Sequence, residues 1–141
     1  MNKQFEILPH TADVRLKVFG KTKEKLFQNA LLGMAAILKE SPIKNKKLFK
    51  IKIGVKSPDI NSLLIDFLSE VLYRSQVNKA IYRNVEFSKF SDTEIEAEIF
   101  GFKVDAFDED IKAVTYHELE IKKTPPTGGD DGFEAIIIFD V

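Results

Sequence analysis

The sequence predicts an α+β fold in which two helices pack on one side of a mostly antiparallel sheet. Two segments, at 23–39 and 58–75, carry apolar residues at helical spacing. The segments around them alternate between apolar and polar residues, as half-buried strands do. The order of strand, helix, strand, helix and then several strands favours a single two-layer domain over residues 1–141.

The first strand is predicted at 12–20, because Val14, Leu16 and Val18 alternate there with charged residues. Thr22 follows directly and is a suitable N-cap for the first helix. The apolar band of that helix is broad, which indicates packing against a sheet.

The second strand is predicted at 47–55, which also alternates, and the helix at 58–75 has the clearest apolar stripe in the chain. We expect Ser57 to cap this helix and Pro58 to occupy its first turn. Asp59 lies where the helix dipole favours negative charge.

The second half of the chain is predicted to consist of strands joined by turns. They lie at 82–90, 93–101, 110–123 and 133–141. The last of them is apolar on both faces from Ile136 to Phe139, which is typical of a strand at the centre of a sheet.

The composition limits the chemistry that the chain can perform. It has no cysteine, which excludes disulfides, zinc–thiolate sites and cysteine nucleophiles. The 21 basic and 22 acidic residues give a net charge of −1, which argues against a protein whose main task is to grip nucleic-acid phosphate, although it allows a local basic face. With no signal peptide and no run near the roughly 20 apolar residues of a membrane span, we expect no membrane partner and a cytoplasmic location.

The polar stretch "PHTAD" lies just before the first strand and places His10, Thr11 and Asp13 together. Two interpretations are open. These side chains can bond nearby backbone N–H groups in a turn, or they can serve a binding site at the entrance of the strand.

The chain ends in "IIIFDV", where a strongly apolar strand leads directly to Asp140 and Val141. Either the strand simply runs out with an exposed aspartate, or Asp140 and the terminal carboxylate of Val141 are a pair of oxygen ligands. A third carboxylate would complete a site for a hard cation, and Asp13 is the natural candidate. Without thiolates, oxygen ligands favour magnesium, calcium or manganese.

The stretch "DIKAVTYHELEI" at 110–121 reads as a strand with unexpected polar residues. Alternation would put Thr115 and His117 on one face and Lys112 and Tyr116 on the other. Taken singly, each is more typical of a scaffold than of a catalyst. No nucleophile–base pair and no phosphate-binding loop is visible anywhere in the chain, so we expect no enzymatic activity.

"PHTADV", "IKAVTYHELEI" and "IIIFDV", in this order, resemble the archease family. The two helical segments, "GKTKEKLFQNALLGMAAIL" and "SPDINSLLIDFLSEVLY", are also similar to the helices of that family, so the resemblance covers essentially the whole chain. The chain departs from the family at Arg15, where members often have glycine.

The resemblance implies an accessory protein and not an enzyme. Archeases activate the tRNA-splicing RNA ligase, which uses GTP and a divalent metal, by promoting its guanylylation and multiple turnover. The implied partner is therefore this ligase, and tRNA is reached only through it. Two alternatives stay open: a metal-dependent hydrolase or nuclease, and a general nucleic-acid-binding or chaperone-like adaptor.

The resemblance also implies a divalent metal ion, Ca, Mg or Mn, as cofactor. Its ligands would be Asp13, Asp140 and Val141. The family has an important lysine in the strand that matches "KAVTYH", which is Lys112 here. The residues that would orient the ligands or contact the partner are Lys112, Thr115, His117 and His10.

Overall fold

The computed structural model describes residues 4–8, 13–39, 47–117, 119–124 and 132–141. Its two helices are α1 (Lys23–Leu38) and α2 (Ile60–Asn78). Its strands are β1 (Phe5–Leu8), β2 (Asp13–Gly20), β3 (Phe49–Lys56), β4 (Ala80–Phe90), β5 (Glu94–Lys103), β6 (Ala113–Thr115), β7 (Lys122–Thr124) and β8 (Gly132–Asp140).

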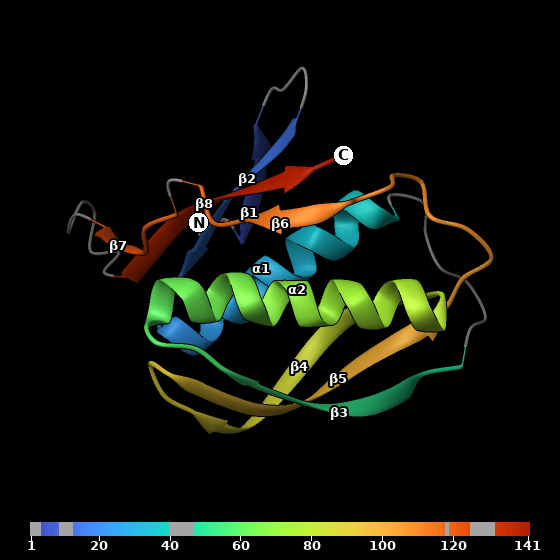
Figure 1. The fold of residues 1–141 in the computed structure, drawn as a ribbon, viewed down its shortest axis with the longest axis horizontal. Helices are drawn as coiled ribbons and strands as arrows, with labels where there is room; N and C mark the ends of the chain where they lie inside the picture. The colour runs from blue at the N-terminus through green and yellow to red at the C-terminus, as the bar shows by residue number, and fades with distance from the viewer. Residues whose placement is uncertain (1–3, 9–12, 40–46, 118, 125–131) are drawn as a thin grey trace.

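The strands form two antiparallel sheets, and the helices lie between them (Figure 1). One sheet has the order β1-β2-β8-β6, with β7 also paired to β8, and the other has the order β3-β5-β4. Helix α1 contacts β2 and β4, and α2 contacts β6 and β3, so each helix touches both sheets. Neither helix in the described part of the chain is long and apolar enough to cross a membrane.

The predicted α+β class, the two helices and the antiparallel pairing are confirmed. The difference is that the strands divide into two sheets, which makes three layers where the sequence predicts two. The reason lies in the helices, because α1 is buried on almost every side. A single sheet covers only one face of a helix, so the remaining apolar surface requires the second sheet.

Aromatic side chains join the two helices to strand β4. The ring of Phe27 on α1 lies 5.7 Å from that of Phe67 on α2 and 5.0 Å from that of Phe90 on β4. Phe87, also on β4, lies 6.0 Å from Phe67 and 5.1 Å from Phe90. Both helices are thereby fixed against the β3-β5-β4 sheet.

The first predicted helix cap is confirmed and the second is wrong. The side chain of Thr22 accepts a hydrogen bond from the backbone N–H of Lys25, as an N-cap does. For α2 the cap is Asp59, which accepts from the N–H of Ser62, and not Ser57. The Ser57 hydroxyl instead donates to the side chain of Asp66, in the second turn of the helix.

The two strands that end at the candidate site follow the predicted alternation. Val14, Leu16 and Val18 of β2 are buried. Strand β8 is central, because it pairs with β2 on one side and with β6 and β7 on the other. The single strand predicted at 110–123 is wrong, since the described residues there form only the short strand β6 and the start of the short strand β7.

Glycine at position 101 is required by close packing, which can be tested. A Cβ atom there would lie 2.4 Å from the carbonyl oxygen of Ile81 and 2.7 Å from the ring of Tyr82. We expect Gly101→Ala to lower the free energy of unfolding by about 1–3 kcal/mol, measured by denaturant titration followed by circular dichroism. Gly54→Ala in β3 is the matched control, because its Cβ would meet nothing closer than 3.9 Å. Equal effects of the two substitutions would contradict this account.

Candidate functional site

The antiparallel ladder between β2 and β8 places Asp13 directly opposite Asp140. Directly opposite residues on antiparallel strands point to the same face, with Cβ atoms roughly 4.5–5.5 Å apart. The two aspartates lie near opposite ends of the sequence, but the strand pairing makes them one carboxylate pair at the end of the ladder.

The pair faces away from the helices. Their neighbours Val14 and Phe139 are buried in the core, and side chains alternate along a strand, so both aspartates lie on the outer face of the sheet. Arg15 is on the same face, two residues along β2, at a spacing of roughly 6.6–6.8 Å. The arginine that departs from the family pattern is therefore a cation beside the carboxylate pair.

The end of β8 is held on both sides. The backbone N–H of Lys112 donates to the carbonyl of Asp140 at 2.7 Å, and Ala113 of β6 lies opposite Asp140. The side chain of Val141 packs against the core. The backbone at Asp140 is thus fixed by β2, by β6 and by the core contact of the next residue.

The other predicted residues are less close to the pair. Thr115 lies opposite Ile138, one row further along the outer face, and its hydroxyl accepts the N–H of His117 at 3.3 Å. His117 is exposed in the turn after β6, four residues beyond Ala113 and leading away from the aspartates. The side chain of Lys112 is exposed, next to the site through its backbone. His10 and Thr11 lie outside the described residues.

Among the described residues, the candidate metal site consists of the two carboxylates of Asp13 and Asp140. Within the described ranges, no three His, Asp or Glu side chains come together in a group that could hold a metal ion. The carboxylates of Asp13 and Asp140 fit a divalent cation, because they are two oxygen ligands on one face of the sheet and such ions prefer oxygen. A third ligand from Val141 stays a prediction.

Three side chains of α2 hold the 110–121 segment in place, and the sequence analysis missed them. Gln76 donates to the carbonyl of Ile111 at 2.9 Å, Asp66 accepts a hydrogen bond from the Tyr116 hydroxyl, and Asn61 accepts the N–H of Ile121 at 3.0 Å. These residues belong to the polar part of an amphipathic helix, which sequence reasoning assigns to water. Only the tertiary structure reveals their partners.

These contacts explain why the segment is not one strand. The backbone turns after Thr115, and the Tyr116 carbonyl accepts from the N–H of Leu119 at 3.4 Å. In the stretch that connects β6 to β7, hydrogen bonds to α2 take the place of pairing with β8. The hydrogen bond to Asp66, together with partial burial and the negative charge nearby, raises the pKa of the Tyr116 phenol.

Residues 5–141 match the model of the Archease protein family (MTH1598/TM1083). The chain belongs to the archease family. The archease of Methanosarcina barkeri is 38% identical to it over 150 residues, which cover 99% of this chain and 97% of that protein. The archease of Thermoplasma acidophilum is 33% identical, covering 97% and 93%.

Solved archease-like structures share the fold. Protein 1598 of Methanobacterium thermoautotrophicum, solved in solution, has a TM-score of 0.71 at 23% identity and covers 98% of this chain and 99% of that one. The crystal structure of an archease from Thermotoga maritima, described as a possible chaperone, has a TM-score of 0.64 at 16% identity, covering 100% and 98%. At these identities the likeness concerns the fold alone.

The anchoring of the 110–121 segment by Gln76 can be tested by hydrogen exchange. We expect Gln76→Leu to speed exchange of the amides around Ile111 and Lys112 about fivefold, as expected for the loss of one hydrogen bond. Gln28→Leu is the control, because Gln28 on α1 also donates to a backbone carbonyl, that of Val85, far from the segment. Equal changes near Lys112 in both variants would show that Gln76 does not hold the segment.

The raised pKa of Tyr116 gives a prediction for alkaline pH. The neutral phenol donates to Asp66, so its contribution to stability is fully present below the ordinary tyrosine pKa of about 10 and is lost as pH rises through the higher folded value. We expect Asp66→Asn to lower the pKa of Tyr116, measured by ultraviolet titration with Tyr116→Phe to assign the transition. The transition of Tyr82, whose pKa is raised chiefly by burial, should not move.

Proposed function

We propose that this protein is an accessory protein of a GTP- and metal-dependent tRNA-splicing RNA ligase and that it acts through a divalent cation. The observation that carries the proposal is the register of β2 and β8, which brings Asp13 and Asp140 together in a chain of the archease family. The proposed ligands are Asp13, Asp140 and Val141. The protein itself performs no ligation.

Electrostatics supports a cation at this position. Two carboxylates directly opposite each other on one sheet face repel, and this costs roughly 0.2–1 kcal/mol. Arg15 offsets part of that repulsion from two residues away, but a divalent ion bound by both carboxylates removes it. When bound, such an ion supplies positive charge that can bind phosphate oxygens.

The contacts around the carboxylate pair support a metal site that is already rigid before the ligase binds. Asp140 is fixed through its carbonyl by the Lys112 amide, and the segment that carries Lys112 is fixed to α2 by Gln76. Rigid placement of oxygen ligands reduces the cost of ordering them on binding. We propose that the exposed ammonium group of Lys112 contacts the ligase beside the metal.

The proposal is tested by replacing each aspartate with asparagine, which removes the charge at nearly constant volume. We expect Asp13→Asn and Asp140→Asn each to weaken manganese or calcium binding by at least about tenfold, the effect typical of changing even groups that only orient a ligand. Without metal, the same substitutions should raise the free energy of unfolding by about 0.5 kcal/mol, because the repulsion is gone. Calorimetric titration and thermal unfolding measure the two effects.

The functional part of this test is ligase turnover at limiting metal, with and without the protein. Both variants should fail to stimulate multiple turnover, whereas Asp105→Asn, an exposed carboxylate away from the ladder, should stimulate normally. The protein alone should show no ligase, GTPase or nuclease activity. Unchanged metal affinity and unchanged stimulation in both aspartate variants would refute the proposal, and RNA cleavage that disappears in Asp13→Asn would favour the hydrolase alternative.

A chaperone-like role is the second candidate, because the relative from Thermotoga maritima is described as a possible chaperone. It predicts that the protein slows ligase aggregation on heating and that Asp13→Asn does so equally well. Light scattering of the ligase with each variant distinguishes the two roles, since metal-dependent activation requires the carboxylates and a general chaperone surface does not.

A further inference from the structure

The outer face of the β3-β5-β4 sheet divides into two chemically different halves. Strand β5 turns Ile95, Ala97, Ile99 and Gly101 inward, where they are buried, so the alternate residues lie outside. In order along the strand, these outer residues are Glu94, Glu96, Glu98, Phe100 and Phe102. Acidic residues therefore occupy one half of the face and two phenylalanines the other.

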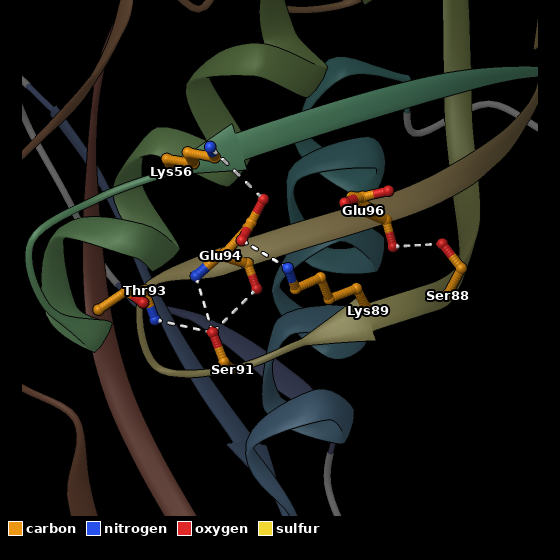
Figure 2. Close-up of polar contacts among 7 residues, drawn as sticks. All are labelled: Lys56, Ser88, Lys89, Ser91, Thr93, Glu94 and Glu96. Atoms are coloured by element: carbon orange, nitrogen blue, oxygen red, sulfur yellow. Dashed lines mark hydrogen bonds and ion pairs between the residues drawn. The ribbon is translucent and has the colours of Figure 1, made fainter.

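Glu94 and Glu98 of the acidic half are paired with lysines, and Figure 2 shows the two pairs of Glu94. Glu94 binds Lys89 at 2.8 Å and Lys56 at 3.9 Å, and Glu98 binds Lys50 at 3.5 Å. The hydroxyl of Ser91 accepts the N–H of Glu94 at the tip of the β4–β5 hairpin. This half is a solvated network of ion pairs, typical of a sheet surface that faces water.

The phenylalanines of the other half are apolar, so contact with water does not account for their place on the outer face. Phe100 and Phe102 are absent from the core and from the partly buried apolar residues that pack against it. They line a hollow on the surface, together with Leu48, Arg83, Asn84 and Glu86. Leu48, which directly precedes β3, is 54% exposed and adds apolar surface to the hollow.

Two exposed cations near the hollow have no ion-pair partner among the described residues. Arg83 is exposed and makes no hydrogen bond or ion pair with any described residue. Lys47, which precedes Leu48, is the other. Lys50 lies opposite Phe100 and is paired with Glu98. Glu86 is the one carboxylate in the lining. The rim thus offers cations beside two aromatic faces, with one acceptor at the edge.

We propose that this hollow binds unpaired bases of single-stranded nucleic acid. Two aromatic residues at alternate positions on the central strand of an open sheet can each stack a base, about 6.6–6.8 Å apart along the strand. Arg83 and the neighbouring lysines would neutralise phosphates, and Glu86 would accept from an exocyclic amino group of cytosine or adenine. The site is independent of the carboxylate pair and goes beyond the proposed function, in which the ligase alone contacts RNA.

The test uses a fluorescein-labelled RNA of alternating C and A, about 12 nucleotides long, in fluorescence anisotropy with the full chain. Phe100→Leu and Phe102→Leu keep an apolar side chain but remove the stacking face, and each should weaken binding about fivefold or more. Tyr73→Leu is the matched control, because Tyr73 is an exposed aromatic residue on α2, and it should leave affinity unchanged. Arg83→Gln should weaken binding and reduce its salt dependence, whereas Lys21→Gln should not.

Two further measurements locate the site and its ligand. Amide chemical shifts on adding the RNA should change mainly around Leu48, Arg83 and Phe100, and the same RNA in a perfect duplex should bind much more weakly, because its bases are already stacked. Asp13→Asn should bind the RNA normally, which separates this proposal from the metal site.

The proposal is overturned if no binding is detected, if both phenylalanine variants bind as well as the original chain, or if the shifts lie elsewhere. It is also overturned if the phenylalanine variants keep RNA binding but lose ligase stimulation. In that case the hollow is a docking surface for the ligase protein.

Discussion

The register of β8 against β2 is the constraint on which the candidate metal site depends. All eight residues of β2 pair with β8, and the inward residues of both strands are buried. A slip of β2 by one residue would turn Val14, Leu16 and Val18 out of the core and bring charged side chains such as that of Arg15 into it. The hydrophobic core therefore fixes the positions of Asp13 and Asp140, although neither belongs to it.

Helix α2 extends that constraint to the third strand at the site. Its apolar side closes the core between the two sheets, and its polar side chains Asn61, Asp66 and Gln76 bind the segment that follows β5. The segment has only three residues paired to β8 near Asp140, too few to be stable alone. The helix thus supplies the anchoring that the short strand β6 lacks, and Lys112 stays beside Asp140.

Local patterns predicted most elements well, because both helices and the strands at β2, β3, β4, β5 and β8 have strong periodicity. Contacts between distant segments were not predictable in this way. The split into two sheets follows from burial on several sides of α1, and the broken strand at 110–123 follows from its anchors on α2. The residue types made Asp13 a candidate partner of Asp140 and the family resemblance implied the pair, but no sequence pattern shows which strands are neighbours.

The three-layer arrangement leaves binding to the outer faces of the sheets. The helices occupy both inner faces, so the outer faces of the two sheets are the sheet surfaces open to other molecules (Figure 1). One surface ends in the carboxylate pair, and the other carries the phenylalanine hollow. A molecule bound on one face would not obstruct the other. A near-neutral chain can therefore have two chemically opposite surfaces, because the core holds them apart.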